Sequence, residues 1–166
     1  LSYPPLKINK NDFILIKGIS GRGKSTWIDL LFGIRKPLKG KVNNYLDNKS
    51  VIYLNANVNN EDIENIFESY FYKLSNLFFS NKENSKLKKI RDICGINFLN
   101  YRNIREIKNL KNKKLSSGQY QRLQLFIALV LSPKLLILDE SLNAIEIDLE
   151  HKILRNMKEI LNDITV

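Results

Sequence analysis

The stretch GISGRGKST, residues 18–26, follows the apolar run FILIK (13–17) and precedes a helix-favouring segment that begins near Lys24. It matches the pattern G-x-x-x-x-G-K-S/T, in which glycines let the backbone turn its N–H groups inward around a phosphate. The lysine of such a loop reaches the β- and γ-phosphates, and the next hydroxyl ligates Mg²⁺. We therefore expect a buried strand over 13–17, a phosphate-binding loop and a helix, in that order.

A second group of informative residues is LLILDE, residues 135–140. The segment 135–139, unbroken in its apolar residues up to Leu138, is typical of a central strand in a parallel sheet, covered on both faces. At its end, Asp139 is placed to hold Mg²⁺ through water, and Glu140 to polarise a water for attack on a γ-phosphate. Two acids can also simply end a strand at the surface, but the phosphate loop upstream favours the functional interpretation.

The remaining segments alternate between strand-like and helix-like patterns. Residues 61–112, which contain no proline, predict a mainly helical insertion, and we expect its aromatic cluster, 67–79, to pack against neighbouring helices. The resulting order of strand, helix, helical insertion, helix, strand and helix is that of an α/β domain. The other predicted elements are a turn leading into a short strand at 37–42, a strand at 50–54, and helices at 117–131 and 146–162.

Length and composition indicate one globular domain. The chain has 166 residues, 43% of them hydrophobic, which is enough for one core and too few for two ordinary domains. No apolar run is long enough to span a membrane, and the single cysteine, Cys94, fits a reducing compartment. Because the chain starts without methionine and ends on the strand-favouring DITV (163–166), we expect it to be part of a longer protein, truncated at both ends.

The formal net charge is +10, from 27 Lys and Arg against 17 Asp and Glu. The basic run KLKKIR (86–91) contains no aromatic residues on which bases could stack. Asn, Ile and Lys are abundant throughout the chain, a bias that raises the charge without selecting a partner. We therefore expect no nucleic-acid partner.

A third stretch, LSSGQ (115–119), stands at the start of the next expected helix. By itself this pattern predicts only the N-terminal cap of that helix. Beside the other two stretches, however, the chain resembles the ABC ATPases. Residues 18–26, 115–119 and 135–140 are similar to the Walker A, signature and Walker B motifs of that family, in the family's order. Ser117 replaces the first glycine of the usual LSGGQ signature, and SLNAIE (141–146) is similar to the D-loop.

The resemblance implies an α/β P-loop NTPase with a mainly parallel central sheet. A helical subdomain, at about 61–114, would be inserted between Walker A and the signature, and 1–166 would form a single, partial ABC ATPase domain. In the family, two such domains pair head to tail, and each ATP lies between one Walker A loop and the partner's signature. The expected partners are therefore a second ABC ATPase domain and a transmembrane domain of a transporter, on the cytoplasmic side of the membrane.

The resemblance also implies site residues for ATP and Mg²⁺. Glu140 and Lys24 would be catalytic, and Ser25 and Asp139 would hold the metal. The residues that would contact ATP are Gly18, Ser20, Gly21, Arg22, Gly23, Lys24, Ser25 and Thr26 in Walker A, and Ser116, Ser117, Gly118 and Gln119 of the signature, which face the ATP of the other subunit.

The chain departs from the family pattern at three places. Where the family has a glutamine after the strand at 50–54, this sequence offers Asn55 or Asn57. The switch histidine is expected beyond residue 166; His151 lies in the preceding helix and is expected to be solvated. The aromatic residue that stacks on adenine is expected upstream of residue 1, with Tyr3 as an alternative.

Two other classes of function remain open. A soluble ABC ATPase of translation or DNA repair is one, although repair types with a long coiled coil are disfavoured because Lys24 and Ser116 are only 92 positions apart. A domain that binds ATP with little turnover is the other. Glu140 argues against this class, and the missing glutamine and histidine argue for it. We expect the chain to bind Mg-ATP and to hydrolyse it poorly.

Overall fold

The computed structural model of the protein describes six parts of the chain: residues 3–19, 21–43, 50–55, 85–96, 115–160 and 164–166. Among them, no helix is long and apolar enough to cross a membrane. The helices and strands in these parts are α1 (Lys24–Leu31), β1 (Val51–Asn55), α3 (Ser85–Cys94), α5 (Ser117–Val130), β2 (Leu135–Asp139) and α6 (Ile147–Ile160).

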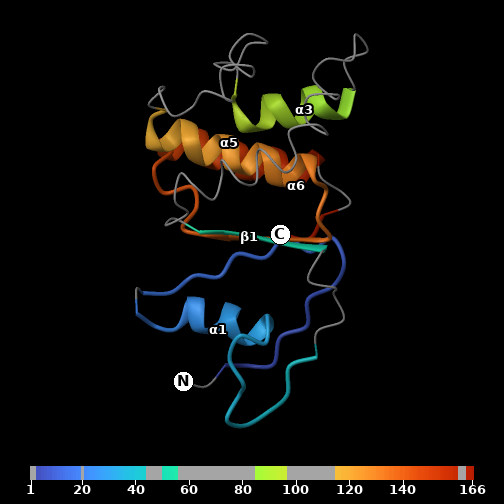
Figure 1. The fold of residues 1–166 in the computed structure, drawn as a ribbon, viewed down its shortest axis with the longest axis vertical. Helices are drawn as coiled ribbons and strands as arrows, with labels where there is room; N and C mark the ends of the chain where they lie inside the picture. The colour runs from blue at the N-terminus through green and yellow to red at the C-terminus, as the bar shows by residue number, and fades with distance from the viewer. Residues whose placement is uncertain (1–2, 20, 44–49, 56–84, 97–114, 161–163) are drawn as a thin grey trace.

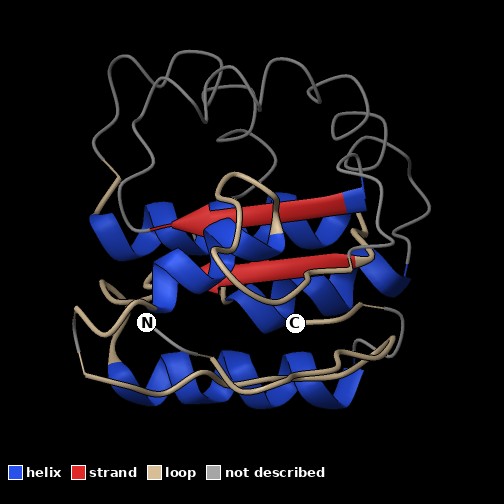
Figure 2. Ribbon diagram, turned by 90° about the horizontal axis from the view of Figure 1, so that it is seen from below, coloured by secondary structure: helices blue, strands red, loops and turns tan. Residues whose placement is uncertain are grey.

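The two strands form a parallel pair, and both run in the same direction in Figure 2. Val51 pairs with Leu135, and the register continues to Asn55 opposite Asp139. On its other edge β2 forms a parallel bridge from Leu135 to Thr165, so it lies between two neighbours. This confirms the prediction of a central strand, and it places the carboxyl ends of β1 and β2 side by side.

The helices lie on the two sides of this sheet, as Figure 1 shows. One side is covered by α1, and the other by α5 and α6, with α3 packed outside them. The core lies on the second side, where Phe126 of α5, Leu136 of β2 and Ile153 of α6 are almost fully buried. The amphipathic pattern of α6 is confirmed, since Ile153 and Met157 face the core and His151 is exposed.

Within the expected helical insertion, the structure describes α3. This helix buries Leu87, Ile90, Ile93 and Cys94. Burial raises the pKa of the Cys94 thiol well above its usual range, so the thiol stays protonated. The Arg122 guanidinium donates from Nη1 to the Gly95 carbonyl at 2.6 Å and ties the end of α3 to α5. The aromatic cluster at 67–79 lies outside the described residues.

Two predicted strands are wrong. Residues 13–17 are extended but form no strand, and Leu15 and Ile16 are 68% and 42% exposed. Ile14 N donates to the Val166 carbonyl at 2.7 Å, and Val166 N donates to the Asp12 carbonyl at 2.9 Å. The described part of this neighbour, residues 164–166, is too short for a ladder. Residues 38–40 bend as predicted, but 41–43 form no strand, because no described strand lies beside them.

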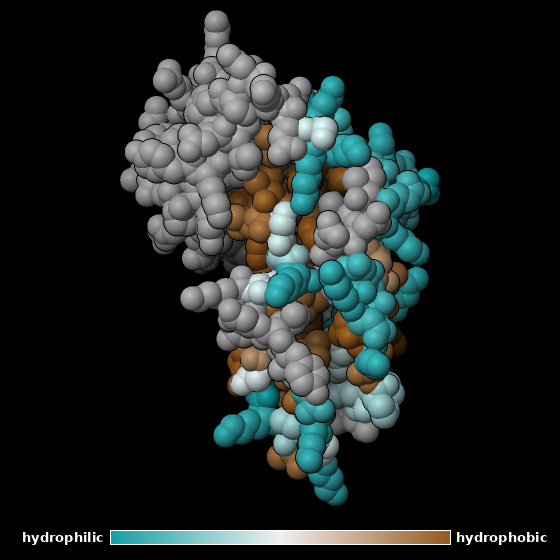
Figure 3. All heavy atoms as spheres, turned by 90° about the vertical axis from the view of Figure 1, so that its right-hand side faces the viewer, coloured by the Kyte–Doolittle hydropathy of each residue, from teal (hydrophilic) through white to brown (hydrophobic). Residues whose placement is uncertain are grey.

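Several apolar side chains of the N-terminal part are exposed. They are Leu6, Leu15, Ile16, Ile19, Ile34 and Leu38. The face in Figure 3 shows apolar surface running between hydrophilic groups, rather than a continuous hydrophilic coat. The N-terminal part is therefore less completely covered than the part that contains α5 and α6.

Candidate functional site

The loop at 18–23 turns sharply before α1. Gly21 and Gly23 have φ of +78° and +86°, in the left-handed region that side chains other than glycine rarely adopt. Gly23 is the N-cap of α1, so the loop leads directly to the positive end of the helix. Arg22 is exposed, and Ser20 lies outside the described residues. The two glycines are thus required by the turn that an anion-binding loop makes.

Lys24 reaches back across this loop from the first position of α1. Its Nζ donates to the carbonyl oxygens of Gly18 at 3.0 Å and Ile19 at 3.4 Å. The adjacent Thr26 is partly buried. The hydroxyl of Tyr3 also reaches the loop and donates to the Gly23 carbonyl at 2.8 Å. An ammonium group therefore lies beside the turned backbone, where the charge of a phosphate would be neutralised.

Ser25 and Asp139, which are 114 positions apart, meet below the loop. Ser25 Oγ donates to Asp139 Oδ2 at 3.0 Å. Hydroxyl and carboxylate oxygens are the ligands that Mg²⁺ prefers, and Mg²⁺ is usually held by one or two carboxylates together with substrate phosphates. The pair therefore fits a metal ion that arrives with a nucleotide.

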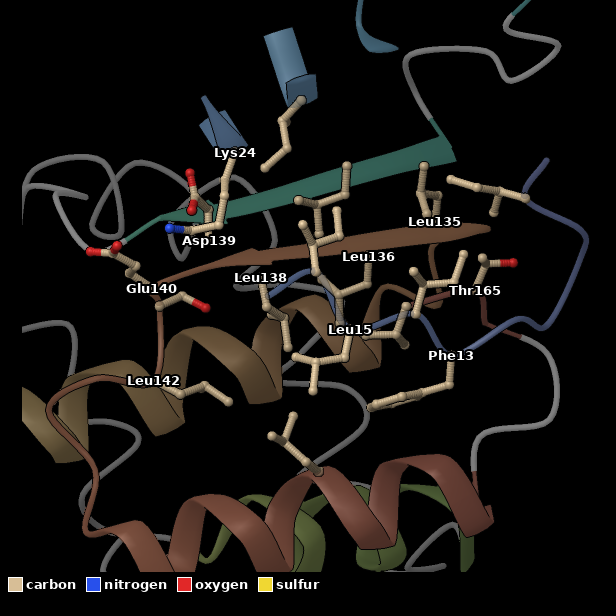
Figure 4. Close-up of a pocket in the computed structure, with 18 of the residues that line it drawn as sticks. Phe13, Leu15, Lys24, Leu135, Leu136, Leu138, Asp139, Glu140, Leu142 and Thr165 are labelled. Carbon is tan, nitrogen blue, oxygen red and sulfur yellow. The ribbon is translucent and has the colours of Figure 1, made fainter. Parts of the chain in front are cut away.

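Glu140 follows β2 and is exposed. Its φ of +54° is left-handed, an uncommon conformation for a residue with a side chain, and such strain clusters at functional sites. Figure 4 shows Lys24, Asp139 and Glu140 gathered at one end of a cavity of about 810 Å³. Further along, the cavity is lined by apolar side chains such as Leu136 and Leu138. These three charged groups therefore lie together at one end of the cavity.

Tyr53 is a residue of this site that the sequence did not reveal. Its hydroxyl donates to Asp139 Oδ2 at 2.8 Å, the same oxygen that Ser25 contacts. Burial, and then the hydrogen bond and charge of Asp139, raise the pKa of Tyr53 to about 12, so its hydroxyl remains a donor at neutral pH. Of the two candidates for the family's glutamine, Asn55 lies opposite Asp139 in the sheet, and Asn57 lies outside the described residues.

The segment 116–119 forms the start of α5. Ser116 Oγ accepts from Gln119 N at 3.2 Å, and Gln119 Oε1 accepts from Ser116 N at 3.1 Å, which is a capping box. The predicted N-cap is therefore confirmed. Ser117 is exposed, and Gly118 is partly buried.

Behind this segment, α5 packs tightly on residues 143–145. A Cβ at Gly118 would lie 2.6 Å from the Ala144 carbonyl oxygen, so only glycine fits there. Gln121 donates from Nε2 to Asn143 Oδ1 at 2.8 Å and accepts from Ala144 N at 2.9 Å. The sequence analysis did not single out Gln121. The signal that could have identified it is a polar residue at a position that the helix buries.

The structure brings together the loop at 18–26 and Asp139, but not the segment 116–119. In Figure 1, α1 and α5 lie on opposite sides of the sheet. Within the described parts of the chain, no hydrogen bond joins residues 116–119 to the phosphate loop. A single copy therefore presents the two segments separately.

In this site a glycine-rich loop turns sharply at the start of a helix. A hydroxyl of that helix donates a hydrogen bond to the carboxylate at the end of a parallel strand. This arrangement defines a P-loop NTPase domain. The model of the ABC transporter family matches residues 2–143. The chain belongs to the ABC transporter family, and the resemblance seen in the motifs is confirmed.

Curated relatives agree with this assignment. The spermidine/putrescine import ATP-binding protein PotA of Borreliella afzelii is 31% identical over 160 residues, which cover 93% of this chain and 45% of the relative. The Fe(3+) ions import ATP-binding protein FbpC of Photobacterium profundum is 30% identical over 164 residues, covering 96% and 44%. The chain therefore spans a little under half the length of these relatives.

Proposed function

We propose that the chain binds and hydrolyses ATP as the nucleotide-binding domain of an ABC transporter, and that ATP-dependent head-to-tail pairing with a second such domain drives transport. The observation that carries this proposal is the hydrogen bond from Ser25 to Asp139 beneath the phosphate loop. Membership of the family supports it, and the curated relatives are named as ATP-binding proteins of import systems.

The proposed roles follow from where each side chain lies. Lys24 and the N–H groups at the start of α1 bind the β- and γ-phosphates. Ser25 and Asp139 hold Mg²⁺, which, when bound, neutralises the charge that develops on the phosphate oxygens. Glu140, exposed beside Asp139, orients and polarises the attacking water as general base. The remaining loop residues, Gly18, Ser20, Gly21, Arg22, Gly23 and Thr26, line the phosphates.

The signature residues act on the nucleotide of the other subunit in this proposal. Ser116 and Ser117 are exposed at the positive end of α5, where they can meet a phosphate from outside. Because α1 and α5 cover opposite sides of the sheet, the exposed end of α5 is free to meet another copy's loop. ATP would then join two copies, and hydrolysis would release them.

The wider assembly is part of the same proposal. A helical subdomain at about 61–114, within the partial ABC ATPase domain 1–166, would contact a transmembrane domain on the cytoplasmic side of the membrane. We propose no nucleic-acid partner. Turnover by the chain alone is expected to be weak, because the chain offers Asn55, opposite Asp139, or Asn57 where the family has a glutamine, and because the family's switch histidine is expected beyond residue 166.

Titration calorimetry of Mg-ATP, with phosphate release followed in the same samples, tests the proposal. The unmutated chain should bind, and Lys24→Ala should lose roughly 100-fold or more in affinity, because a charged partner of the phosphates is removed. Lys36→Ala, which removes an exposed lysine outside the loop, is the matched control and should bind normally. Equal binding by Lys24→Ala, or no binding by the unmutated chain, would contradict the proposal.

A further inference from the structure

The carboxylate of Asp139 accepts two hydroxyl groups on one oxygen. Tyr53 donates to Oδ2 at 2.8 Å and Ser25 donates to the same atom at 3.0 Å. Within the described residues, Oδ1 has no hydrogen-bond partner. The two donors therefore fix the rotation of the carboxylate about its Cβ–Cγ bond and leave the other oxygen for a further ligand.

The sheet register explains how Tyr53 comes to this place. Tyr53 pairs with Ile137, and Asn55, two positions later, pairs with Asp139. Side chains two positions apart on a strand point to the same face, so Tyr53 and Asn55 share the face that carries Asp139. The length of the phenol lets its hydroxyl reach along β2 to Asp139, two residues beyond Ile137.

The Tyr53 ring is also supported from the side of the phosphate loop. It is 39% exposed and packs at 6.3 Å and a tilt of 58° against Phe32, the C-cap of α1. The same helix carries Ser25 in its first turn. Helix α1 thus supplies one donor to Asp139 and steadies the ring of the other, so a shift of α1 would move both.

The phenol of Tyr53 is suited to hold a carboxylate. Its uncharged hydroxyl donates to Asp139 Oδ2 at 2.8 Å. A phenol that retains its proton can orient a carboxylate without competing for its charge, whereas a lysine at this place would neutralise it.

We propose that Tyr53 is a positioning residue for Mg²⁺: together with Ser25 it fixes the Asp139 carboxylate through Oδ2, so that Oδ1 would be left to help hold the metal. The inference rests on the proposed function, because it concerns the metal that accompanies ATP. It adds a residue that none of the three motifs contains. Tyr53 contacts neither the nucleotide nor the reacting water in this proposal, and it acts through Asp139.

The test is Tyr53→Phe, which removes the hydroxyl and keeps the ring against Phe32. The affinity of the full chain for a fluorescent ATP analogue is measured at increasing Mg²⁺ concentrations. The quantity compared between variants is the Mg²⁺ concentration at which half of the Mg²⁺-dependent gain in affinity is reached. We expect it to rise about three- to tenfold, as for the loss of a partly exposed hydrogen bond to a charged group, while affinity in EDTA stays unchanged. An unchanged half-saturating Mg²⁺ concentration overturns the proposal. A lowered one also overturns it, because it would mean that Tyr53 competes with the metal.

Tyr3→Phe is the matched control, since Tyr3 also donates its hydroxyl to the site, but to the Gly23 carbonyl rather than to Asp139. It should change the affinity equally with and without Mg²⁺. Ligand-free thermal unfolding of both variants checks the fold, and a large drop in the midpoint for Tyr53→Phe alone would assign the hydroxyl a structural role and overturn the proposal.

A double-mutant cycle isolates the pair. If Tyr53 acts through Asp139, then Tyr53→Phe should have no further effect on the Mg²⁺ requirement in an Asp139→Asn background, and additive effects would count against the proposal. If the unmutated chain binds the analogue neither with nor without Mg²⁺, the proposed function and this inference both fail. If it binds and responds to Mg²⁺ but Tyr53→Phe behaves identically, only the inference fails.

Discussion

Helices α5 and α1 each begin within a glycine-containing motif, yet their packing differs. The 14 residues of α5 bury eight side chains, whereas the eight residues of α1 bury only Ile28. The difference lies in the neighbours, because α5 lies between the sheet and α3, while α1 covers the other side of the sheet. The two helices thus contribute unequally to the core, since burial requires partners on more than one side.

The comparison predicts unequal losses for the same substitution. Leu129→Ala in α5 removes a fully buried side chain and should lower the free energy of unfolding by about 3–5 kcal/mol. Leu30→Ala in α1, where the leucine is only partly buried, should cost about half as much or less. Urea unfolding followed by circular dichroism measures both. Equal losses would show that α1 is packed as tightly as α5.

A smaller effect is expected where α5 meets residues 143–145. Gly118→Ala should lower the free energy of unfolding by about 1–3 kcal/mol, because its Cβ would press on the Ala144 carbonyl, which is backbone and cannot swing away. Ser117→Ala, at the exposed neighbouring position, should stay within about 0.5 kcal/mol of the unmutated chain. The same urea titration separates the two. If Gly118→Ala proves as stable as Ser117→Ala, the close contact is absent in solution.

The smallest effect is expected at the extended segment 13–17. Leu15→Ser should change the free energy of unfolding by less than about 0.5 kcal/mol, because this leucine is mostly exposed. A loss as large as that of Leu129→Ala would mean that 13–17 is a buried strand after all, as the sequence predicted. The two unfolding midpoints, measured side by side, decide between these alternatives.

Much of the candidate site was predictable, and the reason is local. The glycines, Lys24 and Ser25 occupy consecutive positions whose spacing follows from the geometry of a loop and a helix. Asp139 could be joined to them because it ends an apolar run downstream of a phosphate loop. The capping box of Ser116 and Gln119 was likewise contained in one turn of helix.

The residues that were missed depend on distant neighbours. Tyr53 reaches Asp139 across 86 positions, and Gln121 reaches Asn143 across 22, so neither pair leaves a pattern along the chain. The strand predicted at 13–17 failed for the same reason. Its apolar, β-branched residues favour a strand, but a strand forms only where a neighbour offers a ladder of backbone groups, and the described neighbour here is Val166 alone.

The sequence by itself determined the elements whose cause is local: the phosphate loop, the capped start of α5, the apolar run of β2 and the amphipathic α6. The tertiary structure alone decided which side chains share an oxygen of Asp139, which glycine touches backbone, and which apolar runs find cover. Local conformation is set by each residue's own dihedral and hydrogen-bond preferences, whereas burial and cross-strand contacts depend on the register and packing of segments far apart in the chain.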